Sequence, residues 1–292
     1  MDQTKKAAEA TAAAPAERLD SPLRTEGELA LRFIGAGSAF SKKFYQNNLL
    51  VAKGEDHVLV DCGTRTPEAL ALLGLTVMDV RNYLITHSHA DHIGGLEEVM
   101  LQNRYVARRK PNIVITEKLR DVIWSMSLRG GAAYNERHDG KPLDFLDFWI
   151  PNYPKRRRGE DRELSVATVG GIEIILFRTM HIPDSAAGWR DSFPSYGLVL
   201  DRRVLFTSDS RYDPAMVAAM EAAFKLEAIF HDCQLFKGGV HAALEELAAL
   251  PASTKAKTRL MHYGDKIDDF RPRIAELGFA GVAEQGETYR FR

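Results

Sequence analysis

Short apolar runs separated by polar turns recur along the chain and predict alternating strands and helices. Strands are expected at 29–34, 47–52, 57–60, 83–85, 112–115, 171–177, 196–200, 203–207, 228–230, 259–261, 279–283 and 288–291. Helical spacing of apolar residues indicates helices at 67–73, 96–105, 117–127, 214–224 and 241–250. Thr66 is the expected N-cap of the first helix, because Pro67 follows it at the first helical position. This alternation predicts an α/β fold.

Residues 82–96, N-Y-L-I-T-H-S-H-A-D-H-I-G-G-L, are the most informative stretch of the chain. A buried strand is expected to end at Thr86, and a helix to begin at Leu96. Between them lie four side chains that bind metals, His87, His89, Asp91 and His92. Imidazole and carboxylate groups together suit zinc and similar divalent ions. The alternative is a polar loop that happens to be rich in histidine, which fits poorly in a chain with only nine histidines.

Several predicted strands, including the one before His87, end in a potential ligand. These residues are Asp61, His87, Asp209, His231 and His262. Because binding sites in α/β folds gather beyond the carboxyl ends of the strands, we expect these side chains at one edge of the fold.

Two segments of the chain lack apolar periodicity: residues 1–24 and about 130–170. Residues 1–24 are predicted to form a flexible N-terminal tail, and residues 25–292 a single domain. Within that domain, an insertion at about 130–170 carries three prolines and a basic cluster, and we expect it to be a loop or small excursion that covers the site.

Composition excludes some classes of protein. Hydrophobic residues make up 45% of the 292 residues and charged residues 27%, as in ordinary globular domains. A net charge of −1 gives no overall attraction to nucleic acid. The only cysteines, Cys62 and Cys233, predict no disulfide framework and favour a cytoplasmic location. Neither a membrane-spanning stretch nor a secretory signal peptide is evident, so no membrane partner is expected.

The order of these motifs resembles the metallo-β-lactamase superfamily. V-D-C-G at Asp61, the H-x-H-x-D-H loop, T-M-H-I-P-D at His181, L-F-T-S-D-S at Asp209 and L-M-H-Y-G-D at His262 match its five motifs in sequence. The resemblance implies a four-layer αββα sandwich with two divalent metal ions. Zinc is the expected metal, and manganese and iron are the alternatives.

The resemblance also implies a division of labour among these residues. One metal would be held by His87, His89 and His181, and the other by Asp91, His92 and His262. Asp209 would bridge both metals, and Asp61 would orient a ligand histidine from behind. Hydroxide held between the metals would be the nucleophile. The aspartate at 209, where zinc β-lactamases typically have cysteine, argues against that activity.

Within the superfamily, the segment after Ala228 is similar to the tRNase Z group of phosphodiesterases. I-F-H-D-C-Q and G-V-H-A-A-L stand where that group has H-E-A-T and G-H-S-T, and F-I-G-A-G-S-A-F resembles its opening strand and turn. The similarity implies that His241 is a general acid oriented by Asp232, and these two residues together with Asp91 are the expected catalytic residues. His231 is expected to lie behind the metal ligands and to support them. The alternative for His241 is an ordinary histidine at a helix N-terminus.

The substrate stays open between several classes. A phosphodiester of RNA or of a small or cyclic nucleotide is favoured, and a lactone, ester or thioester is the alternative on the same metals. The glycine- and proline-rich arm with which tRNase Z grips tRNA is not recognisable, and the basic clusters 108–110 and 155–158 are as consistent with a solvated surface as with phosphate contacts. A non-catalytic sensor of the same fold is a third interpretation, and a homodimer is a further expectation for the group.

Overall fold

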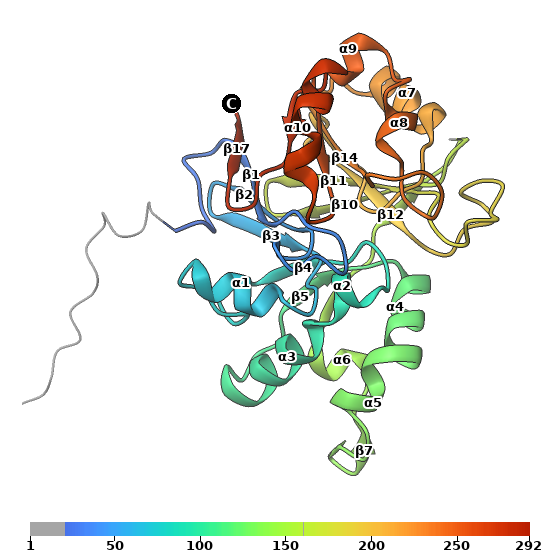
Figure 1. Ribbon diagram of the computed structural model, residues 1–292. Coiled ribbons are helices and arrows are strands. Elements are labelled where there is room, and N and C mark those ends of the chain that lie inside the picture. The colour runs from blue at the N-terminus through green and yellow to red at the C-terminus, as the bar shows by residue number, and fades with distance from the viewer. Residues whose placement is uncertain (1–20, 160) are drawn as a thin grey trace, which may run out of the picture.

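The computed structural model describes residues 21–159 and 161–292, and two mixed β-sheets stacked face to face form its centre (Figure 1). Residues 1–20, most of the predicted tail, lie outside the described residues. Of the last four, Leu23 packs into the hydrophobic core, so the ordered chain begins before residue 25.

The first sheet has seven strands in the order β17-β1-β2-β3-β4-β5-β8. Their bounds are Thr288–Phe291 for β17, Leu29–Gly35 for β1, Asn48–Lys53 for β2, Asp56–Val60 for β3, Asn82–Leu84 for β4, Asn112–Val114 for β5 and Ile150–Asn152 for β8. The strands from β3 to β8 are parallel, so their carboxyl ends meet at one edge.

The second sheet has eight strands in the order β16-β15-β14-β13-β12-β11-β10-β9. Their bounds are Gly281–Val282 for β16, Thr258–Met261 for β15, Ala228–Asp232 for β14, Val204–Phe206 for β13, Tyr196–Leu200 for β12, Ile172–Arg178 for β11, Leu164–Val169 for β10 and Lys155–Arg157 for β9. The strands from β13 to β16 are parallel, which gives this sheet a second shared carboxyl edge.

Helices cover the outer face of each sheet (Figure 1). On the side of the first sheet lie α1 (Thr66–Leu72), α2 (Ala90–Ile93), α3 (Leu96–Leu101), α4 (Glu117–Ile123), α5 (Arg129–Ala132) and α6 (Phe145–Phe148). On the side of the second lie α7 (Pro214–Ala223), α8 (Leu244–Leu247), α9 (Ala252–Lys255) and α10 (Ile267–Glu276). The predicted four-layer αββα sandwich is confirmed.

A cluster of aromatic side chains lies in the core between the sheets. Phe33 of β1 lies 4.9 Å from Phe230 of β14 and 6.4 Å from Phe206 of β13, measured between ring centroids. Tyr289 of β17 packs edge-on against Phe33 at 5.9 Å. Because each fully buried aromatic side chain stabilises the fold by about 1.5–3 kcal/mol, these contacts fix how the two sheets sit on each other.

Several local predictions were wrong. Arg65 rather than Thr66 is the N-cap of α1, and no side chain accepts a hydrogen bond there. The helix expected at 241–250 is reduced to α8, because Gln234 N–H donates to the Ala242 carbonyl and Leu244 N–H to Gln234, which keeps the preceding residues extended. Helix α10 was not expected; its Pro272 interrupts the sequence pattern.

The described part of the predicted insertion, residues 130–159 and 161–170, forms regular elements and does not line the cavity beside the metal-site residues. It contains α5, the hairpin of β6 (Arg137–His138) and β7 (Lys141–Pro142), α6, and then the sheet strands β8, β9 and β10. The hairpin projects from the far end of the first-sheet side (Figure 1), and none of the described residues 130–148 lines that cavity. The V-A-T-V sequence of β10 carried a strand signal that the prediction overlooked.

Candidate metal centre

All seven predicted ligands converge at the edge where the parallel strands of both sheets end. His87 follows β4, and His89, Asp91 and His92 follow within the loop and α2. From the second sheet come His181 after β11, Asp209 after β13 and His262 after β15. Their ligand atoms form two overlapping groups, in each of which every ligand atom lies within 4.8 Å of the others.

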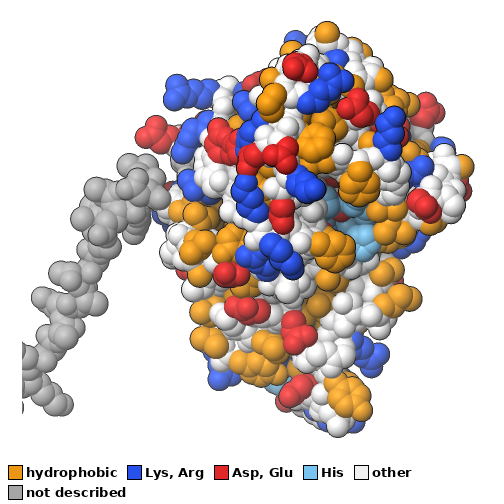
Figure 2. Space-filling model, viewed as in Figure 1, with side chains coloured by type: hydrophobic (Ala, Val, Ile, Leu, Met, Phe, Trp, Pro, Cys, Tyr) orange, Lys and Arg blue, Asp and Glu red, His pale blue; other side chains and the backbone are white. Residues whose placement is uncertain are grey.

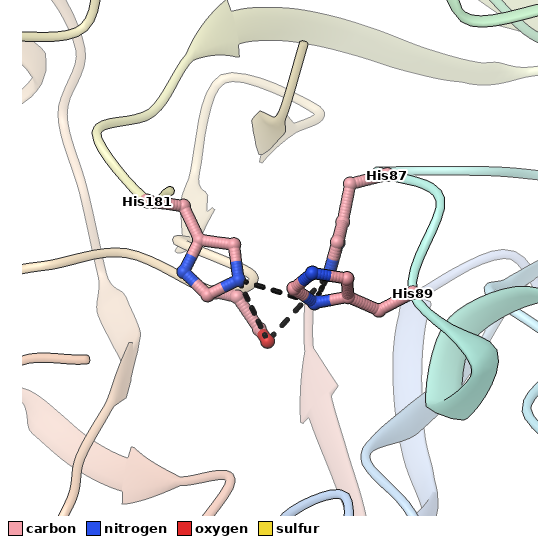
Figure 3. Close-up of side chains that lie close together, drawn as sticks. His87, His89 and His181 are labelled. Atoms are coloured by element: carbon pink, nitrogen blue, oxygen red, sulfur yellow. Dashed lines mark hydrogen bonds and ion pairs between the residues drawn. The ribbon is translucent and has the colours of Figure 1, made fainter. Parts of the chain in front are cut away.

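The first group consists of His87, His89, His181 and Asp209. Figure 3 shows the three imidazole rings pointing toward one another. His89 Nδ1 lies 3.1 Å from His87 Nε2 and 3.3 Å from His181 Nε2. Asp209 Oδ2 lies 3.6 Å and 3.7 Å from the same two Nε2 atoms. Nitrogen lone pairs that converge in this way fit a cation better than they fit hydrogen bonds among themselves.

The second group consists of Asp91, His92, His262 and again Asp209. His92 Nε2 lies 3.3 Å from both Asp91 Oδ2 and Asp209 Oδ1, and His262 Nε2 lies 3.4 Å from Asp91 Oδ2. His92 Nε2 and Asp209 Oδ1 are buried without a hydrogen-bond partner. Since an unpartnered buried polar atom is costly, both atoms are suited to binding a cation, and the residues fit two divalent ions that share Asp209.

The histidines and carboxyl groups of the site favour the ionised form of the carboxyl groups. Burial disfavours the ionised form of Asp209, but His262, His92 and His87 outweigh burial and hold its pKa well below the usual range. Burial alone would also lower the pKa of His262; the carboxylates of Asp209 and Asp232 raise it well above 6.5 instead. The carboxylates are therefore already in the form that binds cations.

Asp61 holds the second group from behind. Its Oδ2 lies 2.7 Å from His92 Nδ1, which leaves His92 Nε2 facing the metal position. Thr86 N–H donates to Asp61 Oδ1 at 2.8 Å and the Thr86 hydroxyl to Oδ2 at 2.7 Å. Asp61 has a φ of 63°, a conformation that aspartate adopts more readily than most residues. A carboxylate behind a ligand histidine fixes its tautomer and orientation.

Phe193 is a site residue that the sequence did not indicate. Its ring stacks on His89 with centroids 5.3 Å apart and lies 5.7 Å from the ring of His181. The buried Arg178 guanidinium fixes the loop before it by donating to the carbonyls of Trp189, Ser192 and Phe193. Phe193 follows no motif, and only the three-dimensional contact reveals it.

Asp232 and His241 form a hydrogen-bonded pair beside the second group. His241 Nδ1 lies 2.7 Å from Asp232 Oδ2, and the His241 ring stacks on His262 with centroids 4.6 Å apart. Asp232 Oδ1 lies 3.4 Å from His262 Nδ1, so one carboxylate contacts both imidazoles. A third group of Asp209, Asp232, His241 and His262 thus overlaps the second and is no separate site.

His231 lies apart from these groups. It is fully buried, its Nδ1 faces the Asp232 carbonyl at 2.8 Å, and it belongs to none of the three groups formed by the described residues. Along β14 its side chain points to the opposite face of the sheet from Asp232.

Comparison with known proteins gives one family. The family model described as "Anti-Pycsar protein Apyc1" matches residues 29–289. A protein named Anti-Pycsar protein Apyc1 from Paenibacillus harenae is 37% identical over 248 residues, which are 85% of this chain and 95% of that protein.

Solved structures of low sequence identity share the fold. The metallo-β-lactamase fold protein YhfI from Bacillus subtilis aligns with a TM-score of 0.64 and 15% identity over 90% of this chain and all of that one. The short form of human tRNase Z aligns with a TM-score of 0.58 and 17% identity over 89% of this chain and 98% of that one. The predicted metallo-β-lactamase fold and its likeness to tRNase Z are confirmed.

Proposed function

The chain belongs to the Apyc1 family of anti-Pycsar proteins, and from this premise we propose that it hydrolyses the phosphodiester of a cyclic mononucleotide with two bound divalent ions, in the first instance zinc. The predicted class of enzyme, a metal-dependent phosphodiesterase, is confirmed at the level of the family. The particular nucleotide, the identity of the metal and the roles of individual residues are the proposal.

The observation that carries the proposal is the Asp232–His241 pair next to the second group of ligands. Asp232 is fully buried and also accepts a hydrogen bond from Ser210 N–H at 2.8 Å. Burial favours the neutral form of Asp232, but His241 and His262 lower the pKa of its carboxyl group. The ionised carboxylate therefore accepts a hydrogen bond from His241 Nδ1. His241 Nε2 is thereby free to hold a second proton.

An alkyl phosphodiester needs a proton donor because an alkoxide leaves poorly. Burial lowers the pKa of His241, but the charge and hydrogen bond of Asp232 more than compensate and raise that pKa above 6.5. His241 is therefore protonated in a larger share of molecules near neutral pH than a free histidine. A lactone or thioester does not need this donor so strongly, which is why the pair favours a diester.

Two divalent ions bound by these residues would supply Lewis-acid stabilisation of charge on the phosphoryl oxygens and would lower the pKa of a bound water. The protein itself supplies the position of each group. Asp209 spans the two groups of ligands, Asp61 fixes His92, and the Phe193 ring packs against the histidines of the first group.

The size of the adjoining space favours a small substrate. A cavity of about 560 Å³ borders His241 and His262, and this volume is within the range of pockets for single small molecules.

Among the described residues no helix has the length and apolar character needed to cross a bilayer. The two cysteines are buried and free, which supports the predicted cytoplasmic location, where cyclic nucleotides act.

The direct test measures turnover by the zinc-loaded protein on 3′,5′-cyclic mononucleotides, a precursor tRNA, a lactone and a thioester. We expect a linear nucleoside monophosphate from the cyclic nucleotide as the fastest reaction. Robust lactone or thioester hydrolysis without diester hydrolysis would overturn the proposal, and preferential cleavage of the tRNA would replace the cyclic nucleotide by RNA.

The His241→Ala variant tests the proton donor. We expect its kcat to fall about 100-fold or more on an alkyl diester but less than about tenfold on bis(p-nitrophenyl) phosphate, whose leaving group needs no proton. The matched control is His138→Ala, which removes an exposed histidine of the β6–β7 hairpin and should leave both rates unchanged. Equal losses on the two substrates would contradict the role of His241 as the acid.

A further inference from the structure

The cavity beside the metal centre has walls of unusual composition. Three segments form it, around Ser38–Phe40, Gln234–Phe236 and Gly264–Phe270, with His241 and His262 bordering it. In Figure 2 the pale blue histidine side chains lie in a hollow bordered mainly by hydrophobic side chains. The walls of this cavity are therefore largely apolar, although it adjoins a strongly polar metal centre.

Two exposed phenylalanines stand at this cavity. Phe40 is 87% exposed and Phe236 is 69% exposed, and they come from segments almost 200 residues apart in the sequence. Isolated exposed apolar residues are common on protein surfaces. Two large aromatic side chains on one concave site are different, because an exposed apolar patch of this kind marks a binding site.

Hydrogen bonds hold both loops in place. The Asp265 carboxylate accepts from the Ser41 hydroxyl and from the backbone N–H groups of Lys42 and Lys43, so the residues after Phe40 are anchored to the opposite wall. On the other side the Gln234 side chain donates to the Gly238 carbonyl. The aromatic side chains are thus presented by loops that are already ordered, which reduces the entropy lost on binding.

The position of the proposed acid decides what occupies the cavity. His241 would protonate the oxygen that leaves phosphorus, and in a cyclic nucleotide that oxygen stays attached to the nucleoside. The nucleoside must therefore lie on the His241 side, where this cavity begins. A flat nucleobase is the part of the substrate that aromatic, apolar walls bind best, through stacking.

We propose that Phe40 and Phe236 bind the nucleobase of the substrate and so hold the cyclic phosphate over the metal centre. This inference rests on the proposed function and adds the residues that recognise the base. Each phenylalanine contributes to binding of the nucleoside and not to the chemical step, since its side chain has no group that can bind a metal or transfer a proton.

The test compares a substrate that has a base with one that lacks it. The substrates are 3′,5′-cyclic AMP and the 3′,5′-cyclic phosphate of 1-O-methylribose, and the variants are Phe40→Ala and Phe236→Ala in the zinc-loaded full chain. Stacking on an aromatic side chain is worth about 1–3 kcal/mol per base, so we expect each variant to raise KM for cyclic AMP about tenfold. KM for the base-free substrate and kcat for both should stay unchanged, and Phe236→Trp should retain the wild-type KM.

The control variant is Tyr134→Ala, which removes an aromatic side chain that is 80% exposed but lies in the insertion, at a different cavity. Binding can be measured separately with 2-aminopurine riboside 3′,5′-cyclic phosphorothioate, because stacking on an aromatic ring quenches the fluorescence of its base. Both alanine variants should weaken this quenching, whereas Tyr134→Ala should not.

Four results would overturn the inference. Unchanged KM for cyclic AMP in both variants would show that the base lies elsewhere, and equal increases for both substrates would show a purely structural effect. If the wild-type protein hydrolyses the base-free substrate as well as cyclic AMP, the base is not recognised, although the proposed function stands. If it hydrolyses neither, the proposed function fails and this inference fails with it.

Discussion

Asp209 is the residue on which the two groups of ligands depend. It is buried, it faces imidazoles of both groups, and one of its oxygens has no hydrogen-bond partner. Two divalent ions bound side by side would repel each other, and a shared carboxylate would offset that repulsion. The loss of a single charge at this position should therefore affect both ions.

We predict that Asp209→Asn, which preserves the size of the side chain, reduces the zinc content from two ions to at most one per chain. The affinity for the lost ion should fall more than about 100-fold, since even residues behind a ligand affect affinity 10- to 100-fold. Elemental analysis after dialysis against a zinc buffer measures this. Asp121→Asn changes an exposed carboxylate and is the matched control. Retention of both ions in Asp209→Asn would show that this carboxylate does not bridge them.

His57 is a buried histidine far from this chemistry. Its Nε2 accepts a hydrogen bond from Arg81 N–H at 3.1 Å, so it is neutral in the folded protein. Burial, and then the charge of the Arg81 side chain, lower the pKa of His57 to about 4, whereas Asp56 acts in the opposite direction and Arg24 in the same one. Between pH 6.5 and 4 the unfolded chain therefore binds a proton that the folded chain does not.

This difference predicts that stability falls as the pH is lowered through that window. From pH 7 to pH 5, His57 should remove about 2 kcal/mol from the free energy of unfolding. Urea unfolding at both pH values, for the wild type and for His57→Gln, isolates the effect, because glutamine can still accept from Arg81 N–H but does not titrate. Equal losses in the two proteins would mean that His57 is protonated in the fold.

At the scale of the elements, the loop after β3 and the H-x-H-x-D-H loop are packed backbone against backbone. Cys62 N–H donates to the His92 carbonyl at 2.8 Å, and Gly95 N–H to the Cys62 carbonyl at 2.9 Å. A Cβ atom on Gly63 would lie 2.0 Å from the Asp91 carbonyl oxygen. Only glycine permits this approach, which sets the position of Asp91 and His92.

Gly63→Ala should therefore displace the metal-binding loop. We expect a loss of stability of about 3 kcal/mol or more and a lower zinc affinity, because the clash is with backbone that cannot rotate away. Thermal unfolding and zinc titration measure the two effects. Gly130→Ala, at a helical position with open space around it, should be neutral or slightly stabilising. If Gly63→Ala behaved like Gly130→Ala, the contact would not position the loop.

The sequence predicted correctly those features that are encoded within a short stretch of the chain. The strand that precedes His87 and the ligands that follow it lie within a dozen residues, so apolar pattern and chemistry together located them. The path from Asp232 to His241 depends on hydrogen bonds that Gln234 makes with Ala242 and Leu244. No sequence pattern indicates these bonds, so the helix there was predicted too long. Phe193 reaches His89 through a loop fixed by Arg178, and such contacts between distant segments leave no signal in a single sequence.

At the scale of the whole molecule, the metal centre joins the two halves of the sandwich. His87, His89, Asp91 and His92 belong to the first-sheet half, whereas His181, Asp209 and His262 belong to the second. Each group of ligands contains residues from both halves. Bound ions would therefore act as crosslinks between the sheets, in addition to the aromatic core around Phe33.

Removal of the metals should consequently lower the stability of the entire fold and not only that of the loop. A ligand that binds only the folded state stabilises it by about 2.7 kcal/mol when its concentration is 100 times its Kd, and two ions contribute twice. Urea unfolding across zinc concentrations set by a metal buffer should show this dependence, and hydrogen exchange should slow in strands of both sheets when zinc is added. Asp209→Asn should retain at most half of the zinc-dependent stabilisation, because it holds at most one ion. Protection confined to the H-x-H-x-D-H loop, with unfolding independent of zinc, would show that the centre does not connect the halves.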